Sequence, residues 1–336
     1  MRSVPEARGE RVFVGLSGGV DSAVAAALLR DAGAKVTGVF IKGWYPPGLP
    51  CTWASDRQDA MRVAAHLAIP FATLDASAEY KRGVIDYLIA EYKAGRTPNP
   101  DVMCNREVKF GAFYRYAREA GADHIATGHY VSGEKDQRYF LWAVPREAFA
   151  FTFFPLADRT KPEVRALAKR YGLPVFDKPD SQGVCFLGPV SIEEFLAAEL
   201  GVEAGEAVDE RGERVGAHRG AALYTIGERV GLAGGPWYVR EKDLAANRLV
   251  VGRTDALREG RTFTPDVKVR LSQANWLEEP VGELVAQYRY RGPRVRGRIV
   301  GEHFEPTEPF PEPPAPGQSL VCYRGDELLG GGIIEP

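Results

Sequence analysis

A glycine- and serine-rich stretch near the start of the chain limits its fold more than any other feature. Residues 15–22 read Gly-Leu-Ser-Gly-Gly-Val-Asp-Ser, between an apolar run and an Ala- and Leu-rich segment. This order predicts a strand, a tight turn and a helix. Gly18 and Gly19 can adopt a positive φ and let a ligand approach the main chain. The helix beginning near Asp21 presents unpaired N–H groups and the positive end of its dipole to an anion. The stretch therefore predicts a phosphate-binding loop.

This loop differs from a Walker loop because no Gly-Lys-Ser/Thr follows it, so the lysine that would reach a γ-phosphate is missing. It resembles the pyrophosphate-binding loop (PP-loop) of the ATP pyrophosphatase superfamily, whose members cleave ATP between the α- and β-phosphates and pass AMP to a substrate oxygen. A glycine-rich turn that binds nothing is the structural alternative. The resemblance implies ATP and Mg²⁺ as cofactors, with Asp21 as a candidate to position the ion.

The first 130 residues alternate between strand and helix signals. Strand signals lie at 12–16, 35–41, 71–74 and 124–127, and helix signals lie between them. A capping box formed by Ser55 and Gln58 predicts a helix from Ser55 to about Ala68, and a further helix is predicted from about Glu107 to Ala120. This alternation predicts an α/β fold with a parallel sheet. Ligands of such sheets bind at the carboxyl ends of the strands. We therefore expect the residues that follow each strand to converge on one nucleotide.

The character of the sequence changes after Gly201, where short apolar stretches alternate with turn clusters. At 336 residues the chain exceeds the usual size of a single domain. We predict a PP-loop catalytic domain over 1–200, of the adenine nucleotide α-hydrolase type. A small central, mainly β linker domain follows over 201–256. A small C-terminal β-barrel over 257–336 completes the chain.

Composition bears on the partners and the compartment that we expect for the protein. The net charge is −2, so contact with nucleic acid must come from a local patch. No signal-peptide segment and no long apolar run is present, so we expect no membrane span. The four cysteines are too few for a disulfide scaffold, and neither Cys-x-x-Cys nor His-Glu-x-x-His occurs. We expect a cytoplasmic protein without a metal cluster.

Two of the cysteines lie in loop-like segments, of which the second contains glycine. Cys104 follows Asn-Pro-Asp-Val-Met, and Cys185 lies in Asp-Ser-Gln-Gly-Val-Cys-Phe. A thiol near a helix N-terminus has its thiolate form favoured. Asp101 would oppose that effect on Cys104, so it is a candidate proton acceptor or base contact. We interpret Cys51 and Cys322 as small buried hydrophobic residues.

Several segments, in order along nearly the whole chain, are similar to motifs of the bacterial tRNA-specific 2-thiouridylases. The segments are 17–22, 94–101 with Cys104, 126–130, 135–140, 180–186, 316–319 and 330–335. The resemblance implies that ATP adenylates the C2 oxygen of the wobble uridine, position 34, of tRNA. Sulfur from a cysteine persulfide then gives 2-thiouridine, with AMP and pyrophosphate as the other products. The central and barrel domains would contact tRNA.

The resemblance also implies roles for individual residues. Cys185 would carry the persulfide, Cys104 would be the catalytic nucleophile, and Asp101 would act as an acid/base or orienting group. The residues implied to bind ATP are Gly15, Leu16, Ser17, Gly18, Gly19, Val20, Asp21, Ser22, Ile41 and Gly128. Those implied to meet tRNA are Asn99, Pro100, Asp101, His129, Lys135, Asp136, Gln137, Arg289, Tyr290 and Gln318. The partners would be the tRNAs for Lys, Glu and Gln, and a sulfur donor such as a cysteine desulfurase or a sulfur-relay protein.

Two features depart from the family pattern. The loop between Tyr130 and Lys135 is shorter than is usual, and Ile41 stands where the family often has methionine. Neither removes a reacting group, because an adenine contact at Ile41 can come from the backbone.

Arginines and aromatic residues interleave over 288–298. If Gly292 and Pro293 form a two-residue turn, all five arginines of this segment share one face and form a stripe that binds phosphates. A solvated barrel face is the alternative.

Two other functions remain open from the residues alone. One is a different PP-loop adenylating enzyme, such as an amidotransferase or a ligase, which would leave the loop cysteines without a role. The other is a non-catalytic, RNA-binding sulfur carrier, against which the intact loop argues.

Overall fold

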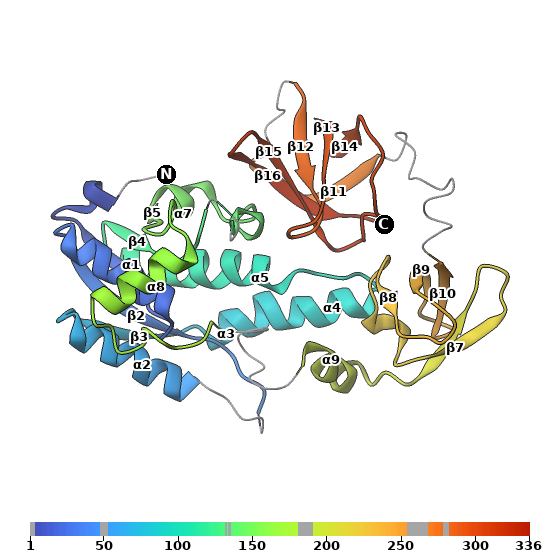
Figure 1. Ribbon diagram of the computed structural model, residues 1–336, viewed down its shortest axis with the longest axis horizontal. Helices are drawn as coiled ribbons and strands as arrows, with labels where there is room; N and C mark the ends of the chain where they lie inside the picture. The colour runs from blue at the N-terminus through green and yellow to red at the C-terminus, as the bar shows by residue number, and fades with distance from the viewer. Residues whose placement is uncertain are drawn as a thin grey trace. The chain divides into compact units, whose positions relative to one another are not determined.

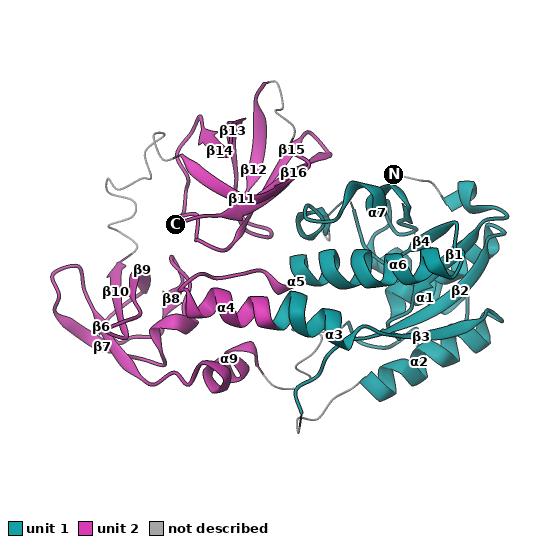
Figure 2. Cartoon of the chain, turned by 180° about the vertical axis from the view of Figure 1, so that it is seen from behind, with its two compact units in different colours: residues 1–85, 101–190 teal, residues 86–100, 191–336 magenta. Residues whose placement is uncertain are grey.

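The computed structural model describes residues 4–47, 53–131, 133, 136–180, 191–253, 268–277 and 282–336. The chain forms two compact units, 1–85 with 101–190 and 86–100 with 191–336, which Figure 2 shows in different colours.

Unit 1 is built on a parallel sheet, which confirms the predicted α/β class. Its strands are β1 (Arg11–Gly15), β2 (Lys35–Lys42), β3 (Phe71–Asp75), β4 (His124–Ala126) and β5 (Thr152–Phe153). They lie in the order β3-β2-β1-β4-β5, and every pairing is parallel (Figure 1). Strand order reverses beside β1, which pairs with both β2 and β4. Such a switch point is where open α/β sheets bind their ligands.

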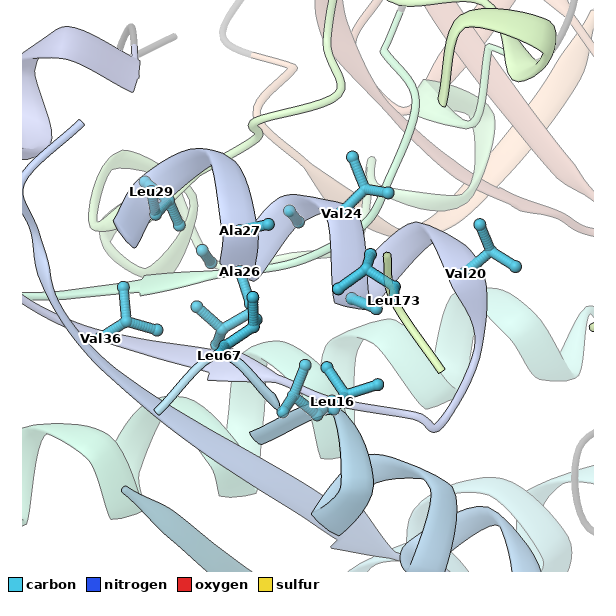
Figure 3. Close-up of a cluster of buried hydrophobic side chains, with 14 of the residues drawn as sticks. Leu16, Val20, Val24, Ala26, Ala27, Leu29, Val36, Leu67 and Leu173 are labelled. Atoms are coloured by element: carbon cyan, nitrogen blue, oxygen red, sulfur yellow. The ribbon is translucent and has the colours of Figure 1, made fainter. Parts of the chain in front are cut away.

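Helices cover both faces of this sheet. Alternate side chains of β1 point to opposite faces, so each set packs against different helices. Val12 and Val14 are fully buried in a core with α1 (Val20–Asp31), α2 (Trp53–His66) and α8 (Lys161–Arg170). Phe13 points the other way and meets Tyr116 of α6 (Phe113–Glu119), with ring centroids 6.4 Å apart. Figure 3 shows part of the core that contains Val12 and Val14. It labels Leu16, Val20, Val24, Ala26, Ala27, Leu29, Val36, Leu67 and Leu173.

Two helix starts in unit 1 differ from the predictions. The helix predicted from Ser55 begins earlier, at Trp53, so Ser55 is not its cap. The helix predicted from Glu107 begins at Pro100. A π-helical stretch that starts at Cys104 joins a first α-helical turn, Pro100–Met103, to the α-helix that starts at Phe113. The remaining helices here are η1 (Val4–Ala7), α3 (Ser77–Tyr80), η2 (Lys81–Asp86), α5 (Pro100–Met103), η3 (Cys104–Ala112), η5 (Arg138–Phe140) and α7 (Arg146–Ala150).

Unit 2 combines a five-stranded sheet with a closed barrel, as the predicted fold class requires. The sheet has the order β7-β6-β10-β9-β8 and the barrel the order β11-β14-β13-β12-β15-β16. Sheet strands are β6 (Gly205–Val208), β7 (Arg214–His218), β8 (Arg229–Val230), β9 (Trp237–Asp243) and β10 (Arg248–Arg253). Barrel strands are β11 (Val269–Asn275), β12 (Leu284–Gln287), β13 (Arg294–Val300), β14 (His303–Pro306), β15 (Ser319–Arg324) and β16 (Glu327–Ile334). Helices α4 (Tyr87–Lys93), α9 (Ile192–Leu200) and η6 (Ala221–Leu223) complete the unit.

The turn predicted at Gly292 and Pro293 is wrong. Gln287 pairs with Arg294, so six residues, 288–293, separate β12 from β13. Tyr288 is fully buried and packs edge-on against Phe310, which draws its side chain into the barrel core and ends the ladder. Arg291 adopts a left-handed φ of 57°. The alternation along β13 is as predicted, with Arg294, Arg296 and Arg298 on its exposed face.

Candidate active site

The predicted phosphate-binding loop joins β1 to α1. The helix begins at Val20, one residue before the predicted start. Ser17 donates its backbone N–H to Ser22 Oγ at 3.2 Å, and Gly19 donates its N–H to Ser17 Oγ at 3.3 Å. Ser22 Oγ in turn donates to the Gly19 carbonyl at 3.2 Å. The two serines therefore fold the loop with bonds that close inside it.

The two glycines of the loop have different roles. Gly18 has a φ of 76°, and a Cβ placed on it would lie 2.3 Å from the carbonyl oxygen of Asp56 in α2. Gly19 is the N-cap of α1, with a φ of −100° and a ψ of 168°. The expectation of a positive φ is therefore confirmed for Gly18 and wrong for Gly19. A glycine is therefore required only at position 18, because of its positive φ and of the nearby Asp56 carbonyl.

Strand ends converge on this loop as the parallel sheet predicts. Gly128 follows β4, and a Cβ on it would lie 3.0 Å from the Ser22 nitrogen. A Cβ on Gly15 would lie 3.8 Å from Ile41 Cδ1 on β2. Residues predicted to hold the nucleotide thus lie together at the carboxyl edge of the sheet.

Asp21 is held by two side chains that the sequence analysis left without a role. Tyr130 Oη donates to Asp21 Oδ1 at 2.8 Å, and Lys161 Nζ donates to the same oxygen at 2.6 Å. Lys161 also pairs with Asp180 Oδ1 at 2.7 Å, where Arg165 Nη2 is a second partner at 2.8 Å. One signal could have singled out Lys161: it is the first residue of α8, where a cation opposes the helix dipole.

The loop suits an anion. The first N–H groups of a helix have no intrahelical partners, and within the described chain no side chain caps α1. The Gly128 backbone approaches them without a Cβ in the way. Amides at a helix N-terminus with a carboxylate beside them fit a nucleotide polyphosphate and its Mg²⁺.

Cys104 begins η3 and is partly exposed. Asp101 reaches solvent, and the protein packed around it raises the pKa of its carboxyl, against the opposing effect of the Lys109 cation. A carboxyl with a raised pKa exchanges its proton closer to neutral pH. Asn105 is 2% exposed, and its Nδ2 donates to the Phe140 carbonyl at 3.1 Å. Cys185 lies outside the described residues.

Three of the residues predicted to meet tRNA in unit 1 have internal partners. His129 is buried between Phe110 and Phe154, with Nδ1 2.9 Å from Thr127 Oγ1, and burial lowers its pKa well below the ordinary value. Asp136 pairs with the buried Arg138 at 2.7 Å. Gln137 Oε1 accepts from the Tyr130 N–H at 3.0 Å. Lys135 lies outside the described residues, and the tRNA contacts remain predictions.

In unit 2, Gln318 bonds to the segment that leads to Asn99 and Pro100. Its Nε2 donates to the Thr97 carbonyl at 2.6 Å, and Thr97 N–H donates to the Pro316 carbonyl at 2.9 Å. Gly317 has a φ of 88°, and a Cβ there would lie 2.7 Å from the Thr97 nitrogen. Residues 316–318 of the barrel therefore clamp Thr97, and we call this the Thr97 clamp.

Arg289 also has partners within unit 2. Its Nη1 pairs with Glu312 at 2.9 Å, and its Nη2 donates to the Ile226 carbonyl at 3.2 Å. Tyr290 lies under the Arg291 guanidinium, 5.2 Å from ring centroid to Cζ. Cys322 is fully buried in the barrel, which raises its thiol pKa to about 12 and confirms its reading as a core residue. Cys51 lies outside the described residues.

In the part of the chain that the structure describes, no helix has the length and apolar character needed to cross a bilayer. Across the same residues, no histidine, cysteine and carboxylate side chains gather as a metal site would require.

An uncapped helix N-terminus after a central parallel strand, at a topological switch point, defines a nucleotide-binding α/β domain, here followed by two β modules. Three family models match consecutive parts of this chain. A tRNA methyl transferase HUP domain matches 10–189, and a tRNA methyl transferase PRC-barrel domain matches 193–253. An aminomethyltransferase beta-barrel domain matches 267–334.

Curated relatives identify the family within that class. The tRNA-specific 2-thiouridylase MnmA of Streptococcus sanguinis is 40% identical over 97% of this chain and 95% of its own. That of Akkermansia muciniphila is 41% identical over 97% of this chain and 98% of its own. The chain belongs to the tRNA-specific 2-thiouridylase MnmA family. Among solved structures, a 4-thiouridine synthetase–RNA complex with bound ATP is similar over 57% of this chain and 50% of that chain, with 22% identity and a TM-score of 0.38.

Proposed function

We propose that this protein replaces the C2 oxygen of the wobble uridine of tRNA by sulfur, at the expense of ATP. The observation that carries the proposal is the extent of the family match: identity of about 40% covers 97% of the chain, and the relatives are named for this activity. The loop geometry supports it, because the amides of α1 and the Asp21 carboxylate suit a nucleotide and its ion.

The adenylation step uses the nucleotide loop. The uridine C2 oxygen attacks the α-phosphate, and pyrophosphate leaves. The first-turn N–H groups of α1 would stabilise the phosphate charge as it develops. Mg²⁺, held with the help of Asp21, would supply further neutralisation of the phosphates. AMP bound through the C2 oxygen makes that oxygen a good leaving group.

The sulfur-transfer step uses the two cysteines. Cys185 would carry the terminal sulfur as a persulfide received from the donor protein. Attack of the Cys104 thiolate on the inner sulfur forms a Cys104–Cys185 disulfide and releases the terminal sulfur as a nucleophile. This sulfur attacks C2, and AMP leaves with the original oxygen. A thiol reductant then restores the two cysteines. The raised pKa of its carboxyl supports a role for Asp101 in exchanging a proton with the target base.

The remaining proposals concern extent and partners. We propose catalytic, linker and barrel domains over 1–200, 201–256 and 257–336, with tRNA contacts in the last two. The substrates would be the tRNAs for Lys, Glu and Gln. A cysteine desulfurase or a relay protein would donate the sulfur, in the cytoplasm. The sequence-predicted tRNA residues remain part of this proposal.

One assay tests the proposed reaction. The protein is incubated with MgATP, a desulfurase with cysteine, and bulk tRNA, and AMP, pyrophosphate and nuclease-digested nucleosides are measured. We expect AMP, pyrophosphate and 2-thiouridine in equal amounts. The variant Asp21→Asn should form no AMP and should still bind tRNA. A parallel reaction with S-adenosylmethionine that gave methylated nucleosides and no 2-thiouridine would overturn the proposal.

A second experiment separates the roles of the cysteines. Cys185→Ser should take up no labelled sulfur from the desulfurase and still form adenylated tRNA. Cys104→Ser should take up sulfur and fail to deliver it. Peptide mapping of the wild type after turnover without reductant should show the Cys104–Cys185 disulfide. Full thiolation by either variant would refute the two-cysteine step.

A further inference from the structure

Tyr130 contacts the nucleotide loop with its side chain and a different segment with its backbone. It is 2% exposed, and its hydroxyl donates to Asp21 Oδ1 at 2.8 Å. Its N–H donates to Gln137 Oε1 at 3.0 Å, and its carbonyl accepts from the Gln137 N–H at 2.9 Å. Tyr130 therefore links Asp21 to Gln137 through hydrogen bonds at both ends of the residue.

The path continues from Gln137 to the neighbour of Cys104. The Gln137 carbonyl accepts from the Phe140 N–H at 2.9 Å, which closes the η5 turn. The Phe140 carbonyl accepts from Asn105 Nδ2 at 3.1 Å. Asn105 Oδ1 is buried and has no hydrogen-bond partner among the described residues. A buried, unsatisfied amide oxygen is costly, so packing alone does not account for an asparagine at this position. All the links lie inside unit 1.

Asp21 Oδ1 is the point where the path meets the nucleotide site. This one oxygen accepts from both Tyr130 and Lys161. A polyphosphate and its cation at the start of α1 change the charge around this carboxylate and compete for its oxygen. Burial, together with the charge of Asp21, raises the pKa of the Tyr130 hydroxyl, so it stays protonated and remains a donor at neutral pH.

We propose that Tyr130 is a positioning residue that couples occupancy of the nucleotide loop to the placement and reactivity of Cys104. The coupling would bring the thiol into its working position only when ATP is bound. This inference rests on the proposed function, since it requires ATP at residues 15–22. The coupling runs through Gln137, Phe140 and Asn105.

The test measures how fast iodoacetamide alkylates Cys104 in the full chain, by peptide mass spectrometry, with and without MgATP. Buried Cys322 should stay unmodified in every sample, which checks that the chain remains folded during the reaction. In the wild type, MgATP should change the Cys104 rate by about fivefold or more. In Tyr130→Phe, which keeps the ring and removes the hydroxyl, the change should disappear. Affinity for ATP, measured by calorimetry, should fall less than about tenfold, because Lys161 still donates to Asp21.

Gln137 provides a matched pair of variants further along the path. Gln137→Glu keeps an oxygen for the Tyr130 N–H and should keep the response, whereas Gln137→Leu should lose it. An equal response in the wild type and in Tyr130→Phe would overturn the coupling, as would ATP binding to the wild type without any change at Cys104. Failure of the wild type to bind ATP at all would reject the proposed function as well.

Discussion

The nucleotide loop and the arginine segment 288–298 differ in where their hydrogen bonds close. In the loop, the hydrogen bonds made by the hydroxyls of Ser17 and Ser22 lie within residues 17–22. In the arginine segment, Arg289 bonds to Glu312 and to the carbonyl of Ile226, a residue 63 positions away. Local bonds set the direction of the loop amides, and distant residues contact the loop at Gly18 and Asp21. The charge that an arginine offers depends on what the fold places beside it.

The first prediction tests the local character of the loop and has the largest expected effect. Gly18→Ala puts a Cβ 2.3 Å from the Asp56 carbonyl and forces a positive φ on alanine. We expect adenylation to be lost and the free energy of unfolding to fall by about 2 kcal/mol or more. Gly19→Ala is the control, since its φ is −100°, and it should stay within about 1 kcal/mol of the wild type. Urea unfolding and AMP formation measure both, and equal effects of the two variants would contradict the geometry.

The second prediction asks how far the loop depends on a distant residue. Lys161→Met leaves the carboxylates of Asp21 and Asp180 without the cation they share. We expect AMP formation to fall about 10- to 100-fold, as for loss of one or two hydrogen bonds to charged groups. Arg165 pairs with Asp180, whereas Lys161 also holds Asp21, so Arg165→Gln should have a much smaller effect. Initial rates at varied ATP give the result, and similar losses in both variants would place the role of Lys161 at Asp180 instead.

The third prediction concerns the Thr97 clamp, where the barrel holds the segment before Asn99. Gln318→Glu turns a donor toward the Thr97 carbonyl into an acceptor. Leaving that contact unmade should lower the free energy of unfolding by about 1–3 kcal/mol and slow thiolation at saturating tRNA. Gln318→Lys restores a donor and should recover most of the stability. A raised KM for tRNA with unchanged stability in both variants would favour the direct RNA contact instead.

The fourth prediction has the smallest effect and addresses the arginines themselves. Arg294 and Arg296 lie on the exposed face of β13. If they meet phosphates, replacing each by glutamine should lower the slope of log K against log salt for tRNA binding by about 0.7–0.9. Arg289→Gln should lower it less, because Glu312 and Ile226 already occupy that guanidinium. Filter binding over a salt series measures the slopes, and a larger change for Arg289 would show that tRNA displaces Glu312.

Much of the fold could be predicted from the sequence, and the exceptions have physical causes. The strands of the parallel sheet follow from short apolar runs between helices. The start of the helix at Pro100 was missed, because π-helical backbone in η3 has no simple periodic signal. The two-residue turn at Gly292 was wrong because burial of Tyr288 ends the strand at Gln287. Packing overrode the local turn signal there.

By itself, the sequence determined the phosphate-binding loop, the alternation that builds the sheet and the exposed face of β13. These depend on bonds and periodicities that span a few residues, so they are visible in a short window. Only the tertiary structure decided that Tyr130 and Lys161 hold Asp21, and that Gln318 clamps Thr97. Those bonds join residues 109, 140 and 221 positions apart. No local pattern encodes such a contact, because it forms only when the folded sheet or barrel brings its two ends together.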